Sequence, residues 1–274
     1  MPMLDYTIGL TTADARHRVA LRLDREQMSQ RFMIEAFDQR HFYESETTHF
    51  LGAVLRPGDT FLDVGAHIGY FSMVAAALVG ATGAVFGFEP ETANFAHLLE
   101  HVELNAAWHV QPVHMAVGER PHVARFFVNA DNDGGHALWD VATHPECART
   151  RQGGETRPVY VTSLDRYFEG RTLASLKAIK IDVEGSEVAA LRGAEQLLLR
   201  HRVPFVIAEV NRFALHAMGT SERELRDYMA GLGYEVYAIC PGETRLARLE
   251  ADDHVDVPYV FNLLFRHPDG PAIG

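Results

Sequence analysis

The sequence predicts an α/β fold of the Rossmann-like kind, with a parallel β-sheet covered by helices on both faces. The main observation is the alternation of short apolar strands and helices from residue 60 to residue 117, in the order β-α-β-α-β. The same alternation resumes at residue 178 and continues toward the end of the chain. No linker or internal repeat divides the 274 residues, so we expect a single folding unit at 56–274, with 1–55 as an extension packed on it.

Glycine and proline turns separate the elements of the first half. Residues 1–24 alternate loosely and predict a small β lead-in, and 28–55 carry a helical pattern that Pro57 and Gly58 stop. The elements expected next are a strand at 60–65, a helix at 68–79, a strand at 84–88, a helix at 92–105 and a strand at 109–117.

The middle of the chain interrupts this alternation. Two predicted strands, 123–128 and 159–164, flank a polar stretch at 129–157 that is rich in Gly, Asp and Asn. A loop of this length in a compact domain is either a lid or a mobile insertion. The elements expected after it are a strand at 178–182, a helix at 187–200, a strand at 204–210, a helix at 222–231 and strands at 234–239 and 259–265.

Composition excludes several classes of protein. The chain has 25 Lys and Arg against 37 Asp and Glu, and no strong basic run, so nucleic acid and anionic membranes are poor partners. No apolar run reaches the roughly 18 residues of a membrane span, and the N-terminus lacks a signal h-region. Cys147 and Cys240 form no CxxC motif. We therefore expect a reduced, cytoplasmic protein.

The first candidate site is the strand-to-helix junction DVGAHIGY, from Asp63 to Tyr70. Gly65 permits a turn and the close approach of a ligand, and Gly69 permits tight packing one helical turn later. Asp63 ends a strand, where open α/β sheets bind ligands. Because His67 interrupts the GxGxxG spacing of dinucleotide sites, the junction suits a zwitterionic amino-acid tail better than a pyrophosphate. A purely structural glycine turn is the alternative.

Two further groups of acids follow predicted strands. Glu89 ends the strand at 84–88, where an acid can bind both hydroxyls of a ribose; NAD enzymes use the same device, and a helix-start acid is the alternative. Asp182, Glu184 and Glu187 follow the strand at 178–182 and would repel one another without a cation or a shared proton. Lys180 neutralises part of this charge, and the two glutamates could instead be first-turn acids of the next helix.

Four segments together resemble the FkbM family of S-adenosylmethionine-dependent methyltransferases: FLDVGAHIGYFS, FGFEPE, IKIDVEGSEVAALRGAEQLL and VIAEVN. The resemblance runs from about Tyr43 to the final strand. The resemblance implies the seven-strand class I methyltransferase sheet, with an antiparallel last strand. It also implies cofactor contacts by position. The implied contacts of the methionine half of the cofactor are Asp63, Gly65, Ala66, His67, Gly69 and Tyr70. By the same resemblance, Glu89 binds the ribose, and Met115 and Ala116 lie beside the adenine. Asp182 is the last implied cofactor contact.

Methyl transfer to a hydroxyl requires alignment of the reactants and removal of a proton. The candidate catalytic residues are Asp182, Glu184 and Glu209, which ends the next strand. Asp182, Glu209 and Asn211 also offer the hard oxygen ligands that suit Mg²⁺. Without a metal, Asp182 or Glu209 would act as a base or as a hydrogen-bond partner.

Histidines and a tryptophan supply secondary candidates. His136, in the long loop, could be a base brought in by lid closure, and Trp139 either covers a substrate or anchors the loop. We interpret His97 and His101, four residues apart on a helix, as part of a solvated face rather than as metal ligands.

We therefore expect an O-methyltransferase that uses S-adenosylmethionine, with Mg²⁺ as an open alternative, and acts on a hydroxyl of a small molecule. The acceptor would be a sugar, polyketide or peptide in natural product biosynthesis. An N-methyltransferase on a small-molecule amine and a non-catalytic cofactor-binding module are the alternatives, and an NAD dehydrogenase is disfavoured by the GxxxG spacing. The sequence does not fix the oligomeric state, although enzymes of this type often form homodimers.

Overall fold

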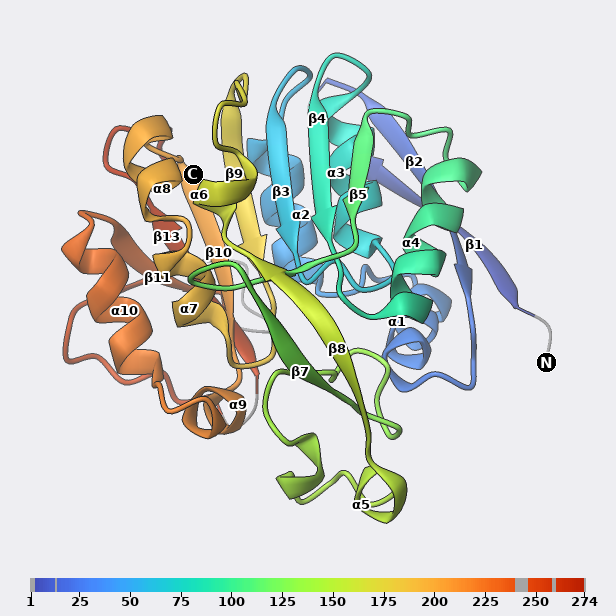
Figure 1. Cartoon of the computed structure of the whole chain (residues 1–274). Helices are drawn as coiled ribbons and strands as arrows, with labels where there is room; N and C mark the ends of the chain where they lie inside the picture. Colours follow the sequence, from blue (N-terminus) through green and yellow to red (C-terminus); the bar gives the residue numbers. More distant parts are fainter. Residues whose placement is uncertain (1–2, 13, 240–245, 258–259, 274) are drawn as a thin grey trace.

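The computed structural model describes residues 3–12, 14–239, 246–257 and 260–273. At its centre lies one mixed sheet with the strand order β12-β11-β13-β10-β9-β3-β4-β5 (Figure 1). Its strands are β3 (Thr60–Val64), β4 (Ala84–Phe88), β5 (Val110–Val113), β9 (Leu176–Ile181), β10 (Phe205–Val210), β11 (Glu235–Ile239), β12 (Ala247–Leu249) and β13 (Phe261–Arg266).

Strand directions confirm the predicted α/β class. β5, β4, β3, β9 and β10 are parallel, and β13 runs antiparallel to both β10 and β11, as expected for the last strand. The sheet has one strand more than the predicted seven, because the short β12 pairs with the outer edge of β11. Strand order reverses between β3 and β9, which makes their carboxyl ends the switch point where open α/β sheets bind ligands.

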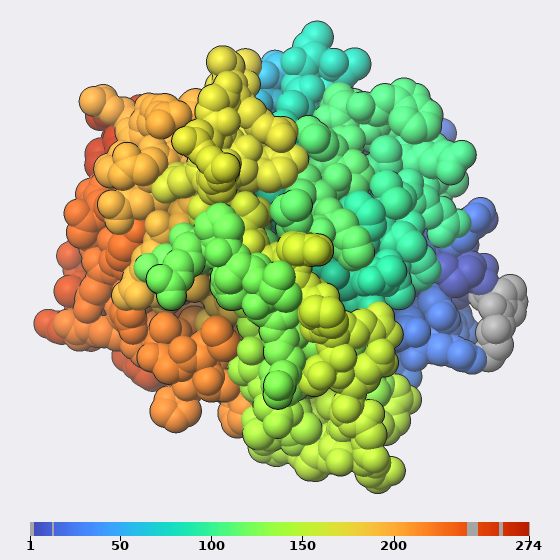
Figure 2. All heavy atoms as spheres, viewed as in Figure 1, coloured from blue at the N-terminus to red at the C-terminus, as the bar shows by residue number. Residues whose placement is uncertain are grey.

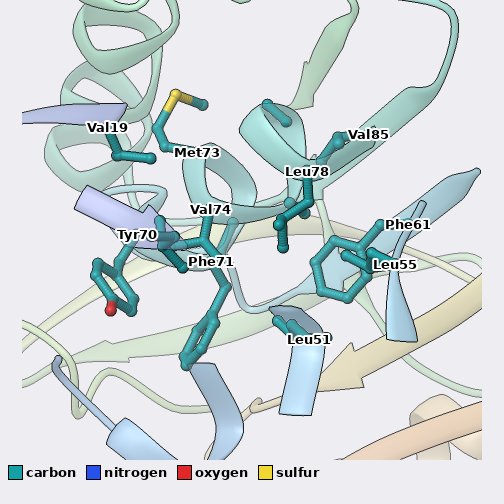
Figure 3. Packing of buried hydrophobic residues seen from close by; sticks show 14 of the residues in the cluster. Val19, Leu51, Leu55, Phe61, Tyr70, Phe71, Met73, Val74, Leu78 and Val85 are labelled. Carbon is teal, nitrogen blue, oxygen red and sulfur yellow. The ribbon is translucent and has the colours of Figure 1, made fainter. Parts of the chain in front are cut away.

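Two hydrophobic cores cover the two faces of this sheet. In β3, Phe61 belongs to one core, and Leu62 and Val64 belong to the other, as the alternation of side chains in a strand requires. Figure 3 shows Leu51 and Leu55 meeting Phe61 in the first core. The helices that cover the sheet or border it are α1 (Met28–Asp38), α2 (Ser45–Val54), α3 (Tyr70–Val79), α4 (Thr92–Leu104), α6 (Leu164–Tyr167), α7 (Glu187–Arg192), α8 (Glu195–His201), α9 (Arg212–Ala217) and α10 (Glu222–Gly231).

The N-terminal extension packs against the first core. Its predicted β lead-in is a hairpin of β1 (Leu4–Thr11) and β2 (Arg16–Leu23), whose second strand contacts α3 and α4. The helical pattern at 28–55 divides into α1 and α2, because Arg40 and Glu44 between them adopt positive φ angles. No helix among the described residues is both long and apolar enough to cross a lipid bilayer.

A second, three-stranded sheet was not predicted. The predicted strand 109–117 ends at Val113, and β6 (Ala116–Val117) pairs instead with β8 (Glu155–Thr162), which also pairs with β7 (His122–Val128). β8 begins four residues before the predicted 159, and Leu164 starts α6 instead of ending the strand. Figures 1 and 2 show the β7–β8 ribbon lying across the front of the molecule.

The segment that joins β7 to β8 has structure of its own. It contains a 3₁₀ helix, η1 (Val141–Thr143), and the single turn α5 (Thr150–Gly153). The Asp131 carboxylate accepts hydrogen bonds from the backbone N–H groups of Arg149 and Thr150, at 3.0 and 2.8 Å, and so closes the segment on itself. These contacts argue against the mobile insertion.

Several smaller predictions also differ from the structure. The predicted helix 187–200 is interrupted between α7 and α8, at Gly193 and Ala194, and α6, α9 and β12 were not predicted. Gly193 lies too close to the Gly118 carbonyl for any side chain, since an added Cβ would sit 2.1 Å from that oxygen. The predicted start of the last strand, Tyr259, and Cys240 lie outside the described residues.

His101 is buried, so the predicted solvated face is wrong at this position. Its Nδ1 lies 2.7 Å from the Ile68 carbonyl oxygen, and its Nε2 lies 2.9 Å from the backbone nitrogen of Arg22. Burial lowers the pKa of His101. The ring therefore connects the N-terminal hairpin to the loop that precedes α3.

Candidate active site

A cavity of about 680 Å³ lies at the carboxyl ends of β3, β4, β9 and β10. This volume falls within the roughly 300–1,000 Å³ of typical ligand sites. Residues from four parts of the chain line it: the segment before β3, the central strands, the β7–β8 region and β13. Of the predicted cofactor contacts, it brings together Gly65, Ala66, His67, Tyr70, Glu89, Met115, Ala116 and Asp182.

The turn after β3 needs its glycines for packing. Gly65 has φ +84°, and a Cβ added there would lie 1.7 Å from the carbonyl oxygen of Asp182. Gly69 has φ +88° at the start of α3, and its Cβ would lie 2.4 Å from the Leu98 side chain. Gly65 lines the cavity, whereas Gly69 lies behind it. The two strand-end backbones, β3 and β9, can meet only because Gly65 lacks a side chain.

Asp63 is not among the residues that line the cavity. It is 2% exposed and accepts a hydrogen bond from the Ser72 hydroxyl at 2.6 Å. Burial raises the pKa of Asp63 to about 6. The structure therefore shows Asp63 bonded to α3 through Ser72, and a direct cofactor contact remains a prediction.

His67 connects three parts of the site. Its φ of +52° is unusual for a residue with a side chain, and its backbone N–H donates to the Glu89 carboxylate at 2.8 Å. Its ring Nε2 lies 2.9 Å from a carboxylate oxygen of Asp133. Burial opposes the charged ring, but the carboxylates of Asp133 and Glu89 hold the pKa of His67 above its usual value.

Glu89 faces the cavity from the end of β4. Its second oxygen accepts a hydrogen bond from the backbone N–H of Glu91 at 2.7 Å. Burial raises the pKa of Glu89 to about 7. Each carboxylate oxygen keeps a second lone pair for a ligand hydroxyl, so the geometry is compatible with the predicted ribose contact. Met115 and Ala116 line the same cavity.

An acidic cluster lies across the cavity. Oxygen atoms of Asp182, Glu184 and Glu209 all lie within 4.8 Å of one another. Burial and the charge of Asp182 raise the pKa of Glu184 to about 8 and that of Glu209 well above its usual value. Glu184 also has a positive φ, +50°. The three predicted catalytic residues are therefore brought together.

Lys180 supplies the compensating charge. Its side chain is 2% exposed, and its Nζ lies 2.6 Å from a carboxylate oxygen of Asp182. The same ammonium lies 4.6 Å from the centre of the Phe71 ring. Burial alone would lower the pKa of Lys180, but the neighbouring carboxylates raise it. The buried ammonium between a carboxylate and an aromatic face therefore stays charged.

Asn211 is placed differently from the prediction. Its amide oxygen accepts the Ala214 N–H at 3.1 Å and caps α9, and its amide nitrogen donates to Glu184 at 3.2 Å. The predicted Mg²⁺ ligand set of Asp182, Glu209 and Asn211 stays a prediction. The third carboxylate beside Asp182 and Glu209 is that of Glu184, and both ends of the Asn211 amide already have partners. The carboxylate donors suit Mg²⁺, but Lys180 already pairs with Asp182.

Glu187 does not converge on the cavity. One carboxylate oxygen accepts hydrogen bonds from the backbone N–H groups of Val183 and Gly185, both at 3.1 Å. Burial raises the pKa of Glu187 to about 7. Its role is to hold the turn between β9 and α7, which is the structural alternative for this glutamate.

His136 and Trp139 have structural contacts. The backbone N–H of Asn129 donates to His136 Nδ1 at 2.9 Å, so the neutral ring carries its proton on Nε2, and burial lowers its pKa to about 4. His136 therefore presents an N–H group to the cavity, and a role as base does not fit. Trp139 donates to the Glu184 carbonyl at 2.8 Å, so it anchors the segment after β7 to the acidic cluster.

Sequence reasoning missed the residues that come from outside the central strands. Tyr43, Glu44 and Thr47 reach the cavity from the start of α2, and Asn262 reaches it from β13. The polar Asn262 within the apolar strand FNLLF was a usable signal. Glu44 had none, because its position depends on a helix break that only tertiary packing determines.

The chain matches known methyltransferases. The model of the methyltransferase FkbM domain family matches residues 63–236. The 31-O-demethyl-FK506 methyltransferase FkbM of Streptomyces tacrolimicus is 31% identical over 209 residues, which cover 68% of this chain and 76% of that protein.

Solved structures are more distant. The FkbM methyltransferase of Methylobacillus flagellatus is 16% identical with a TM-score of 0.45, over 80% of this chain and half of that one. Aeropyrum pernix fibrillarin, solved with S-adenosylmethionine, is 14% identical with a TM-score of 0.38, over 77% of this chain and 67% of that one. The family match and the 31% identical relative establish that the chain belongs to the FkbM family and is an S-adenosylmethionine-dependent methyltransferase.

Proposed function

We propose that the chain transfers the methyl group of S-adenosylmethionine to a hydroxyl group of a small molecule. The observation that carries the proposal is the position of the acidic cluster in the same cavity as His67 and Glu89, the predicted cofactor contacts. The Streptomyces relative is named for a substrate that lacks an O-methyl group, which supports transfer to oxygen. A natural product is therefore the acceptor class that we favour.

The residues of the cavity fit the cofactor. Gly65 lines the cavity at the turn after β3, and Glu89 keeps carboxylate lone pairs for the ribose. When bound, S-adenosylmethionine supplies an electrophilic methyl group. The residues of the chain must align the acceptor hydroxyl with that methyl group and take up the proton that the hydroxyl loses.

The proton acceptor comes from the acidic cluster. Asp182, paired with Lys180 at 2.6 Å, is a carboxylate that can take a hydrogen bond from the acceptor hydroxyl. The pKa values of Glu184 and Glu209 are raised, so these two groups favour their protonated forms and leave Asp182 as the proton acceptor of the cluster. Because Lys180 balances the charge of Asp182, we favour this base over a Mg²⁺-bound acceptor.

The charged residues that line the cavity favour a small molecule over nucleic acid as the partner. Seven acidic residues line the cavity, Glu44, Glu46, Glu89, Glu146, Asp182, Glu184 and Glu209, against Lys180 and Arg212. Arg212 is itself paired with Glu222 at 2.8 Å. A phosphate backbone would meet repulsion at this opening.

Titration calorimetry followed by a product screen tests the proposal. We expect S-adenosylmethionine to bind and NAD not to bind. Incubation with hydroxylated sugars, macrolides and peptides, and with amines of similar size, should release S-adenosylhomocysteine only with hydroxylated acceptors. Transfer to the amines alone would establish the N-methyltransferase, and cofactor binding without any transfer would favour a binding module.

A further inference from the structure

Part of the cavity wall comes from outside the region that the family model matches. Glu44 and Thr47 precede residue 63, and Asn262 follows residue 236. Asn262 bonds both of the other two side chains, so two distant parts of the chain build one surface beside Lys180.

Glu44 adopts a costly backbone conformation. Its φ is +40° at the N-terminus of α2, yet its side chain makes no capping hydrogen bond there. The carboxylate instead accepts the Asn262 amide N–H at 2.9 Å and lies 4.0 Å from the Lys180 ammonium. A left-handed conformation in a residue with a side chain is unfavourable and persists where the surroundings require it. Here the conformation delivers a carboxylate to the cavity.

Asn262 has a fixed orientation and a free oxygen. Its amide nitrogen donates to both Glu44 and the Thr47 hydroxyl, at 2.9 and 3.2 Å. Because both N–H groups are used, the amide cannot flip, and its Oδ1 points elsewhere. Asn262 is 8% exposed, and this oxygen has no hydrogen-bond partner among the described residues.

A second orphaned group lies in the same cavity wall. Ser186 is 2% exposed, and its hydroxyl oxygen also has no partner within the described part of the chain. Buried polar groups without partners are rare in folded proteins, and each one indicates a missing hydrogen-bond partner such as a ligand or a water. The Glu44 carboxylate and the Asn262 oxygen accept hydrogen bonds, so a ligand that binds these two groups must donate.

We propose that Glu44 and Asn262 form the acceptor-recognition pair of this enzyme, which binds an acceptor through neighbouring hydroxyl groups and rejects one that carries a negative charge. This inference rests on the proposed function, because it places the methyl acceptor beside Asp182. The pair receives hydroxyl donors on the Asn262 oxygen and the Glu44 carboxylate. An anionic substituent there would face the Glu44 carboxylate, whereas the neighbouring Asp182 carboxylate is balanced by Lys180.

Binding of three matched sugars tests the inference without requiring turnover. Each charged sugar differs from the neutral methyl glucoside at one carbon: methyl glucosaminide carries a cationic amine at C2, and methyl glucuronide carries an anionic carboxylate at C6. We would titrate each into the protein saturated with S-adenosylhomocysteine and measure dissociation constants by NMR. We expect the neutral and cationic sugars to bind and the anionic sugar to bind at least about tenfold more weakly.

Two substitutions assign this selectivity to the pair. Glu44→Gln should bring the affinity for the anionic sugar close to that for the neutral one. Asn262→Ala should weaken all three sugars by roughly tenfold or more, the cost of a hydrogen bond to a buried polar group. Glu35→Gln, on the exposed face of α1, is the matched control and should change nothing. The affinity for S-adenosylhomocysteine and the melting temperature show whether each variant is folded.

These measurements distinguish a failure of the recognition pair from a failure of the proposed function. If none of the sugars binds, if the glucuronide binds best, or if the folded Glu44→Gln variant keeps the parent's discrimination, the recognition pair is wrong. Loss of discrimination in Glu44→Gln supports the pair even if no methyl transfer is detected. In that case the proposed function, and not the recognition surface, has failed.

Discussion

Gly65 leaves no room for a side chain, and its substitution is the simplest test of the turn. Gly65→Ala would place a Cβ 1.7 Å from the Asp182 carbonyl in a left-handed conformation. We expect a loss of about 3 kcal/mol or more in the free energy of unfolding, and loss of cofactor binding. Urea denaturation and calorimetry measure both.

Gly52→Ala is the matched control for this change. Gly52 lies within α2, and an added Cβ there meets nothing within 4 Å. This variant should gain roughly 0.5–1 kcal/mol. Equal stability of the two variants would contradict the close approach of β3 and β9 at Gly65.

We expect Glu89 to be required for cofactor binding and, when ionised, to lower the free energy of unfolding of the free protein. Glu89→Gln should weaken S-adenosylmethionine binding by roughly ten- to a hundredfold, the cost of a charge-assisted hydrogen bond. Glu103→Gln, on the exposed side of α4, is the control. If calorimetry gives the parent's affinity for Glu89→Gln, the ribose assignment is wrong.

The raised pKa of Glu89 adds a dependence of stability on pH. The group titrates near 7 in the folded protein and near 4.5 when unfolded, so the folded state favours its protonated form. Its favourable contribution is complete below pH 4.5 and is lost as pH rises through 7. Glu89→Gln should therefore gain stability relative to the parent between pH 5 and 8 in urea titrations. A difference that does not change over this range would contradict burial of an ionisable Glu89.

The elements differ in how far local sequence determines them. β3 and β4 were predicted correctly because an apolar run and a glycine or proline turn define each one. The division of 28–55 into α1 and α2 depends on left-handed Arg40 and Glu44, which no local pattern marks. The β6-β8-β7 sheet depends on pairing between residues about 45 apart in sequence, such as Ala116 with Val161, and periodicity does not report partners.

The candidate site divides in the same way. His67, Glu89 and Asp182 follow central strands, so their meeting at one edge was predictable from the parallel sheet. Asn262 and Glu44 meet them only through tertiary packing. Asn211 was predicted as a ligand from its position, but a residue that begins a short helix uses its side chain as a cap.

The segment after β7 is attached to the cofactor turn through Asp133. That carboxylate accepts hydrogen bonds from the Ser29 N–H at 2.8 Å and the Gln30 amide at 3.0 Å, and lies 2.9 Å from His67. Burial raises its pKa, but the contact with His67 outweighs this effect and lowers it to about 2. Asp133→Ala should therefore increase hydrogen exchange at 129–137 and at 65–69 together.

The control for this prediction is Asp140→Ala, which removes an exposed cap of η1 in the same segment. It should change exchange only locally. Cofactor and acceptor should slow exchange and tryptic cleavage in the parent segment if it acts as a lid. Increased exchange at 129–137 without any change at 65–69 would show that Asp133 does not couple the two.

At the scale of the whole molecule, charge decides between the two catalytic alternatives. The chain carries a net charge of −12, and its cavity gathers acids around a single buried ammonium, Lys180. Because this ammonium balances Asp182, EDTA should leave both turnover and cofactor affinity unchanged. Loss of turnover in EDTA, restored by Mg²⁺ or Mn²⁺, would establish the metal alternative at Asp182, Glu184 and Glu209.

The most direct test of the account is the bond that the transferred methyl group forms. The parent and Asp182→Asn would be incubated with S-adenosylmethionine carrying ¹³C in its methyl group and with the hydroxylated acceptors of the screen. NMR distinguishes carbon bound to oxygen from carbon bound to nitrogen. We expect an O-methyl product from the parent, and from Asp182→Asn a small rate that rises with pH as the acceptor ionises unaided. An N-methyl product, or undiminished transfer by Asp182→Asn, would contradict this expectation.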